Sequence, residues 1–270
     1  MVAKGVELGT EDLRRLNEVK SRFLNMAAHE LNTPITPIRL QLHLLQAGAL
    51  GRLEAEQARA VGIVARNVDR LAALVQEILD VARMEGGGLR LKLEPVPLDQ
   101  LIGETWESYE EPARRVGIRL LRPASTNAVV HTDRQRMLQI LYNLMSNAIK
   151  FTPADGEIRM TVNRRRDTVE ICVIDSGIGM TAQQIAGLYR PFTRLHEDDS
   201  TASGGSGLGL YIAQGLAQQL GGHLAASSPG PGKGATFCLT IPLEPSVAAH
   251  IAQPQSAEAE ELARRLRQLI

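Results

Sequence analysis

Two asparagines and a lysine, Asn143, Asn147 and Lys150, follow one another at intervals of four and three residues. If this stretch is helical, the three side chains lie on one face of the helix. Amide oxygens are hard, neutral ligands that suit Mg²⁺ together with phosphate oxygens, and a lysine can hold a phosphate as a point charge. The spacing therefore predicts a face that binds a metal–triphosphate group, although an ordinary solvated polar face explains the same residues.

Two glycine-containing segments further along have residue types that suit a nucleotide. Asp175 ends an apolar, strand-like run, where its carboxylate can accept a hydrogen bond from an adenine amino group, and Gly177 and Gly179 let the backbone approach the base. A second segment opens a predicted helix whose N-terminal amides can bind phosphate, and its residues are Gly205, Gly207, Leu208 and Gly209. No Gly-Lys-Ser/Thr follows, so this is not a Walker loop, and its late position argues against a dinucleotide fingerprint.

Near the N-terminus, His29 is followed by Glu30 and, one helical turn on, by Thr33. At about 100° per residue, His29 and Thr33 share a face that points away from the apolar seam containing Ala28 and Leu31. An exposed imidazole keeps a nitrogen free to attack phosphorus, and an adjacent carboxylate can orient the ring and take its proton. His29 is therefore a candidate phosphoryl acceptor assisted by Glu30, and a simple solvated histidine is the alternative.

Two long helices are predicted around and after this histidine. Apolar residues recur at heptad spacing from Leu24 to Leu45 and again from Ala60 to Val81, with a turn near Gly48 and Gly51. A parallel stripe on the second helix consists of Val61, Val68, Val75 and Ala82. A lone hairpin cannot cover this much apolar surface, so we expect a homodimer in which two hairpins form a four-helix bundle. Packing of the hairpin on its own neighbouring domain is the alternative.

Three glycines, residues 86–88, separate the hairpin from a region of mixed helix and strand patterns. Alternating Leu89, Leu91 and Leu93 predict that a strand begins there. Helices are expected over Leu98–Arg115, Arg134–Lys150 and from the second glycine-rich segment to about Gly221, with strands near Ile118 and Val129, over Ile158–Val162 and Val169–Ile174, and two more ending near Leu243. The expected fold is thus a helical hairpin followed by a two-layer α/β domain. The expected domains are residues 1–86, residues 89–245 and a tail over residues 246–270 with helix-forming composition.

The composition excludes some functions. Thirty basic residues balance thirty acidic ones, so nothing favours nucleic acid as a partner. No apolar run approaches the roughly 18 residues of a membrane-spanning helix, and no signal-peptide core is present, so we expect no transmembrane segment and a cytoplasmic location. Cys172 and Cys238 lie in apolar, strand-like runs without metal-ligand spacing, so buried, reduced thiols are expected rather than a disulfide.

Taken together, the motifs resemble those of sensor histidine kinases. The string from Ala28 to Pro34 is similar to the family's phosphoacceptor motif, with Asn32 where Lys or Arg is usual. Residues 143–151, 175–180 and 204–210 resemble, in this order, the N box and two glycine boxes of the ATPase fold that histidine kinases share with type II topoisomerases, Hsp90-type chaperones and mismatch-repair ATPases. Residues 188–194 resemble the phenylalanine box, with Tyr189 replacing the usual Phe, and residues 232–237 resemble the last glycine box.

The resemblance implies an ATP-binding α/β domain of the histidine kinase, Hsp90 and topoisomerase type. The implied nucleotide-site residues are Asn143, Asn147, Lys150, Phe151, Asp175, Gly177, Gly179, Phe192, Arg194, Gly205, Gly207, Leu208, Gly209 and Thr236. Within this set, Asn147 and Asn143 would hold Mg²⁺, Arg194 would reach the γ-phosphate of ATP, and Thr236 would lie near the adenine.

The implied reaction is ATP-dependent phosphorylation of His29, followed by transfer to an aspartate on the receiver domain of a response regulator. Glu30 and Thr33 also match the family's dephosphorylation motif, which implies phosphatase activity toward that partner. An ATPase that drives conformational change is one alternative, but it requires a glutamate as base for water, and Asn143 stands where those ATPases carry it. A pseudokinase that only docks a partner is the other, and the filled nucleotide boxes argue against it.

Overall fold

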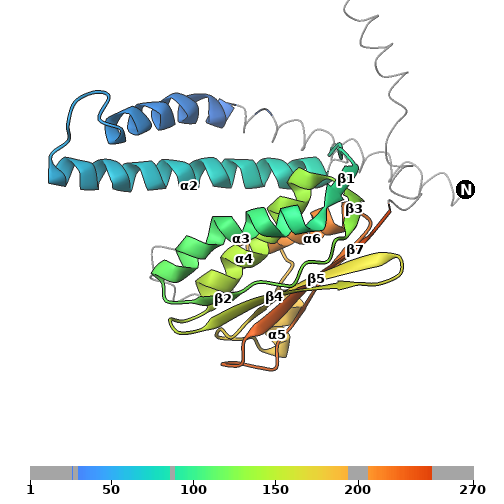
Figure 1. Cartoon of the computed structure of the whole chain (residues 1–270). Coiled ribbons are helices and arrows are strands. Elements are labelled where there is room, and N and C mark those ends of the chain that lie inside the picture. Colours follow the sequence, from blue (N-terminus) through green and yellow to red (C-terminus); the bar gives the residue numbers. More distant parts are fainter. Residues whose placement is uncertain (1–25, 27–29, 86–88, 194–205, 245–270) are drawn as a thin grey trace, which may run out of the picture. The chain divides into compact units, whose positions relative to one another are not determined.

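The structure, a computed structural model, describes residues 26, 30–85, 89–193 and 206–244 (Figure 1). The chain divides into two compact units, Met1–Leu89 and Arg90–Ile270. His29 and the predicted tail over residues 246–270 lie outside the described residues. No helix within the described ranges combines the length and the apolar character needed to cross a bilayer.

The first unit is a helical hairpin, as predicted. Residues 30–46 form one helix and α2 spans Ala55–Glu85, with Gly48 and Gly51 at positive φ in the turn between them. Ile35 packs with Val75 and Leu79 of α2 in a small buried cluster. The two helices are also joined by an ion pair from Arg39 Nε to Asp69 Oδ1, 2.8 Å long and exposed to solvent.

The hairpin leaves other apolar side chains exposed. On α2, Val68 and Val75 of the predicted parallel stripe belong to or pack against the buried cluster. The heptad seam beside it is open, because Val64, Leu71 and Ile78 are 36 to 49% exposed. The two stripes of α2 therefore differ, since one closes the hairpin and the other is partly exposed at Val64, Leu71 and Ile78.

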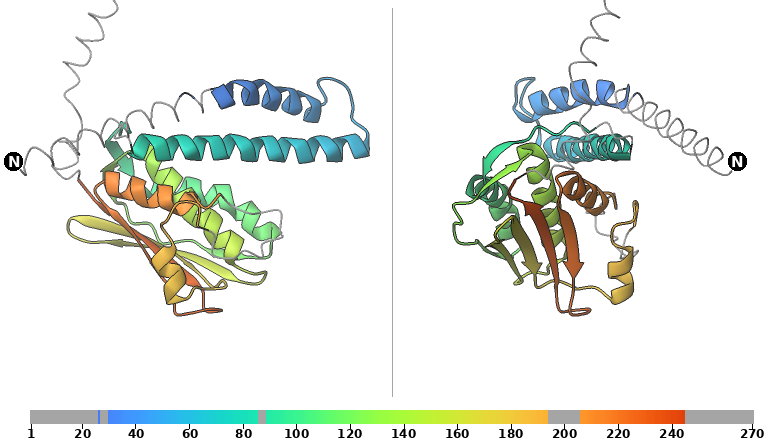
Figure 2. Two further views of the ribbon diagram at one scale, coloured as in Figure 1. Left: turned by 180° about the vertical axis from the view of Figure 1, so that it is seen from behind. Right: turned by 90° about the vertical axis from the view of Figure 1, so that its right-hand side faces the viewer.

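The second unit is a two-layer α/β domain (Figures 1 and 2). Its five-stranded sheet has the order β2-β4-β5-β7-β6, in which β2 and β4 are parallel and the other neighbours antiparallel. The strands are β2 (Arg119–Leu121), β4 (Glu157–Arg164), β5 (Thr168–Asp175), β6 (His223–Ser227) and β7 (Ala235–Pro242). Helices α3 (Leu98–Arg115), α4 (Arg134–Phe151) and α6 (Gly209–Gln219) cover one face of the sheet (Figure 2), and the short α5 (Ala182–Gly187) follows β5.

A separate antiparallel pair, β1 (Glu94–Pro97) and β3 (Val129–Thr132), completes the domain. The predicted strand start at Leu89 is wrong, because residues 89–93 precede β1 and are not in a strand. The backbone N–H of Lys92 donates to Asp133 Oδ2 at 2.8 Å, so this part of the segment bonds a side chain instead of a neighbouring strand.

The core lies between the sheet and its helices. Val169, Ile171 and Val173 alternate along β5, and all three are fully buried. Along β7 the alternate residues Ala235, Phe237, Leu239 and Ile241 are buried in the same way. Helix α4 turns its apolar side chains inward; they include Met137, Ile140, Leu141, Leu144, Met145 and Ala148. Because this face of α4 is buried, the polar residues of α4 lie at the margin of the buried face.

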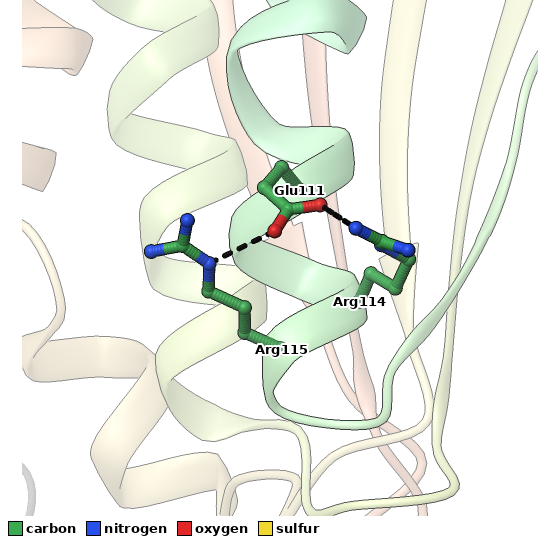
Figure 3. Close-up of polar contacts among 3 residues, drawn as sticks. All are labelled: Glu111, Arg114 and Arg115. Atoms are coloured by element: carbon green, nitrogen blue, oxygen red, sulfur yellow. Dashed lines mark hydrogen bonds and ion pairs between the residues drawn. The ribbon is translucent and has the colours of Figure 1, made fainter.

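Local side-chain contacts define the ends of these helices. Asp133 caps α4 by accepting from Arg136 N at 3.1 Å, which satisfies a free helix N–H. At the exposed end of α3, Glu111 accepts hydrogen bonds from Arg114 and Arg115 (Figure 3), which lie three and four residues further along. The two guanidinium groups lower the pKa of Glu111. Such exposed pairs contribute little to stability.

Cys172 and Cys238 form a disulfide, so the prediction of reduced thiols is wrong. The two residues face each other directly in the register of β5 and β7, with their Cα atoms 4.1 Å apart. They are 66 positions apart in the sequence, and only the pairing of the two strands brings them together.

Candidate functional site

One pocket of the second unit lies between α4, the loop after β5, the start of α6 and β7. It is lined by Asn147, Phe151, Asp175, Ile178, Gly179, Met180, Leu188, Leu210, Ala235 and Phe237. Apart from Asn147 and Asp175, these residues are apolar or glycine. An apolar cleft with a few convergent polar groups suits a flat aromatic ligand that carries hydrogen-bonding groups on its edge.

Asp175 is the buried carboxylate of this pocket, and only 9% of it is exposed. Its Oδ1 accepts hydrogen bonds from Gly177 N at 2.8 Å and from Ala235 N at 3.1 Å. Burial raises the pKa of Asp175, and these two hydrogen bonds oppose that rise. With Oδ1 engaged in this way, Oδ2 forms no hydrogen bond to any residue that the structure describes, so it can accept one from a ligand.

The predicted α4 face contributes to the same region. Asn147 lines the pocket, and its amide forms no hydrogen bond with the described residues. Asn143 donates from Nδ2 to Gln139 O at 3.1 Å, which directs its Oδ1 toward α6, where Gly209 is the first helical residue. Both amide oxygens are thus available to a hard cation, and they fit the ligand type that Mg²⁺ prefers. Lys150 does not line the pocket; its Nζ lies 4.8 Å from the ring centre of Phe151, which does.

The second glycine segment joins the site at the start of α6. Leu208 is 2% exposed and precedes Gly209, and the next residue, Leu210, lines the pocket. Phe192 N donates to Gly207 O at 3.1 Å, so these two positions meet. The Phe192 side chain is 70% exposed and does not line the pocket. Arg194 and Gly205 lie outside the described residues.

The structure does not bring Thr236 into the pocket. The buried residues of β7 alternate, so Ala235 and Phe237 face the helices and line the pocket, whereas Thr236 points to the opposite face of the sheet. The sequence carried a signal for this, because Ala235 is in phase with the apolar series Phe237, Leu239 and Ile241. Ala235 is a residue that the sequence analysis missed, as are Met180, Leu188 and Leu210.

The predicted phosphoacceptor residues belong to the other unit. Glu30 and Thr33 are exposed in the helix over residues 30–46 of the first unit, whereas the pocket belongs to the second unit. His29 itself lies outside the described residues, directly before Glu30.

Each of the two units matches a known protein family. Residues 19–87 match the family described as His Kinase A (phospho-acceptor) domain. Residues 132–245 match the family described as Histidine kinase-, DNA gyrase B-, and HSP90-like ATPase. Fold and family matches therefore define a chain that contains a phosphoacceptor hairpin and an ATPase domain. The chain belongs to the sensor histidine kinases, of which this pair of domains is the catalytic core.

Curated relatives carry the same assignment over most of this chain. An uncharacterized sensor-like histidine kinase of Rhizobium meliloti is 32% identical over 235 residues, which cover 86% of this chain and 45% of the relative. The autoinducer 2 sensor kinase/phosphatase LuxQ of Vibrio cholerae is 32% identical over 232 residues, which cover 84% of this chain and 26% of the relative. The chain thus spans less than half the length of these relatives.

Two solved structures are similar to this chain over most of its length. Full-length ShkA in complex with AMPPNP has a TM-score of 0.70 and 28% identity, covering 85% of this chain and 47% of that one. Histidine kinase ThkA in complex with the response regulator protein TrrA has a TM-score of 0.58 and 25% identity, covering 88% of this chain and 66% of that one.

Proposed function

We propose that this chain is the ATP-dependent protein-histidine kinase core of a two-component system. It phosphorylates its own His29 and passes the phosphoryl group to an aspartate on the receiver domain of a response regulator. The observation that carries the proposal is the pocket containing Asp175 and Asn147, in a chain that also matches the phosphoacceptor family around residue 29.

The pocket supports ATP as the substrate. Asp175 Oδ2 is free of hydrogen bonds to described residues and can accept one from the adenine amino group, while Phe151, Met180 and Phe237 enclose the ring. Asn147, together with Asn143, would hold Mg²⁺, which when bound offsets the charge of the phosphates. Lys150 and Arg194 supply positive charge for the same purpose.

The chemical step requires a nitrogen of His29 in line with the γ-phosphate. The nitrogen forms a bond to phosphorus, the bond from phosphorus to the β–γ bridging oxygen breaks, and ADP leaves. Glu30, beside His29 and exposed, takes the imidazole proton. The product is an acid-labile phosphohistidine.

A response regulator is the proposed partner. Support comes from the ThkA structure, which contains the response regulator protein TrrA. Thr33 lies one turn beyond His29, where its hydroxyl can place a water against the acyl phosphate of the partner. We therefore propose a second, phosphatase activity, and the relative LuxQ is named a kinase/phosphatase.

The hairpin supports a homodimer. Val64, Leu71 and Ile78 have heptad spacing and are 36 to 49% exposed, and a second copy of the hairpin would bury them. We propose that residues 1–86 form this dimerisation and phosphotransfer domain, that residues 89–245 form the ATP-binding domain, and that both work in the cytoplasm, where ATP and the partner are present.

Incubation with ATP labelled at the γ-phosphate tests the proposal. The wild-type chain should acquire a label that acid removes and alkali does not. His29→Gln should lose the label, while its dissociation constant for ATP should stay within about twofold because the pocket belongs to the other unit. His43→Gln is the matched control, because His43 is an exposed histidine of the helix over residues 30–46. Acid-labile label on His29→Gln, or ATP hydrolysis without labelled protein, would overturn the assignment.

A further inference from the structure

Residues 177–180, in the loop after β5, bond to a second loop over residues 228–234. Gly177 O accepts from Gly234 N at 2.9 Å and Ile178 O accepts from Gly232 N at 2.6 Å. The third contact is different in kind, because Met180 N donates to the hydroxyl of Ser228 at 3.0 Å. The loops also touch at Gly179, where a Cβ would lie 2.2 Å from Gly230 O. Residues 228–234 therefore act as a template, because their contacts fix the backbone of residues 177–180.

Ser228 is the side chain at the centre of this template. Its Oγ accepts from Met180 N and from Gly230 N, the latter at 3.2 Å, and donates to Gly234 O at 2.7 Å. A serine hydroxyl has one hydrogen and two lone pairs, so it can accept from both N–H groups and donate to Gly234 O, while Gly230 O at 3.3 Å is the more distant acceptor for the same hydrogen. The hydroxyl is half-buried and does not line the pocket, so it contacts the pocket walls from behind.

The two groups that Ser228 holds lead to two different lining residues of the pocket. Met180 is itself a lining residue. Gly234 precedes Ala235, which lines the pocket and donates its N–H to Asp175 Oδ1. One hydroxyl thereby sets the spacing between the wall formed by Met180 and the carboxylate that faces the ligand.

We propose that Ser228 is a positioning residue for adenine-nucleotide binding, which acts by fixing Met180 and Gly234 through its hydroxyl. This inference rests on the proposed function, because it takes the ligand of the pocket to be ATP. It assigns to Ser228 an effect on nucleotide affinity and none on the transfer step once ATP is bound.

Three variants test this role. Ser228→Ala removes the hydroxyl, Ser228→Thr keeps it, and Ser125→Ala is the matched control, because Ser125 also organises a loop through its hydroxyl but binds Asp99 and lies outside the pocket lining. Each protein is measured for its ATP dissociation constant by calorimetry, for its phosphorylation rate at saturating ATP, and for amide hydrogen exchange at Met180 and Gly230.

Ser228→Ala should bind ATP about tenfold more weakly, since two N–H groups and one carbonyl lose their partner, while its rate at saturating ATP stays within about twofold. Exchange at Met180 should accelerate in this variant alone, and Ser228→Thr should remain near wild type. Equal dissociation constants for wild type and Ser228→Ala would overturn the inference alone. A parallel loss of affinity and saturating rate in both Ser228 variants would also overturn it, by showing a general loss of folding. Absence of ATP binding by the wild-type chain would overturn the proposed function and this inference with it.

Discussion

Gly209, the first residue of α6, lies against Asn143 of α4 so closely that a Cβ at position 209 would be 2.5 Å from Asn143 Oδ1. No real Cβ atom tolerates that distance, so any side chain at position 209 must displace the Asn143 amide or the start of α6. The glycine therefore keeps the amide oxygen in place for the proposed metal and lets the start of α6, which we propose binds phosphate, approach it.

Gly209→Ala should lower the rate of autophosphorylation by about tenfold or more, because the added methyl group displaces a proposed Mg²⁺ ligand. The rate as a function of Mg²⁺ concentration is the measurement, and the variant should need more metal. Gly187→Ala is the control, because a Cβ at that position meets nothing within 4 Å. If the autophosphorylation rate depends on Mg²⁺ concentration equally in both variants, Asn143 is not a ligand of the metal.

Asp175→Asn should weaken ATP binding by about tenfold, since it leaves one acceptor oxygen for Gly177 N and Ala235 N and turns the other position into an N–H donor. That donor would face the donating amino group of adenine. Calorimetry with ATP and with a purine nucleotide that has a carbonyl in place of the amino group should show reduced discrimination between the two. Unchanged affinity for ATP would show that Asp175 does not contact the base.

Thr33→Ala should leave autophosphorylation within about twofold of wild type but slow the loss of phosphate from a phosphorylated receiver domain, because only that reaction uses the placed water. Thr36→Ala is the control, since Thr36 lies one turn further along and its hydroxyl bonds Asn32 O at 3.1 Å. The measurement follows labelled receiver over time with each variant. If receiver loses phosphate equally fast with wild type and Thr33→Ala, Thr33 has no phosphatase role.

The disulfide between β5 and β7 should be detectable in protein purified without reductant. Alkylation followed by mass spectrometry should find no free thiol at Cys172 or Cys238 until a dithiol reductant is added. Reduction should lower the melting temperature, because chain-entropy arguments assign about 4 kcal/mol to closing a loop of this length. Two alkylated thiols before any reduction would contradict the cross-link.

Asp99 should make stability depend on pH in the acidic range. Its carboxylate bonds Ser125 Oγ, Thr126 N and Asn127 N, and these contacts lower its pKa to about 2. A carboxyl whose pKa is lowered by folding stabilises the protein above its unfolded pKa, and that stabilisation is lost as the pH falls toward the folded value.

Urea denaturation of wild type and Asp99→Asn should therefore show a stability difference that shrinks as the pH falls from about 4 to about 2. Asp155→Asn serves as the control, because the Asp155 side chain is exposed and forms no hydrogen bond with a described residue. A difference that stays constant over this range would show that the loop contacts do not depend on the charge of Asp99.

Local patterns were enough to predict most helices and strands of this protein. The predicted helix Leu98–Arg115 is confirmed as α3, and the helix predicted from Arg134 is α4, which ends one residue later than expected. Periodicity succeeds here because a helix or strand must turn its apolar face toward a core, and that requirement is written into consecutive residues. The spacing of Asn143 and Asn147 needs only the helix itself to place both amides on one face.

The contacts that shape the pocket could not be read in this way, because they join segments far apart in the chain. The pairing of Cys172 with Cys238, and the position of Ser228 behind Met180, depend on which strands become neighbours and in which register. The face of the sheet to which Thr236 points follows from the alternation of buried residues along β7, and the comparison of motifs did not take that alternation into account. The sequence by itself therefore determined the elements and the chemical types at the site, whereas only tertiary structure decided which side chains meet, because strand register and loop contacts come from packing between distant segments.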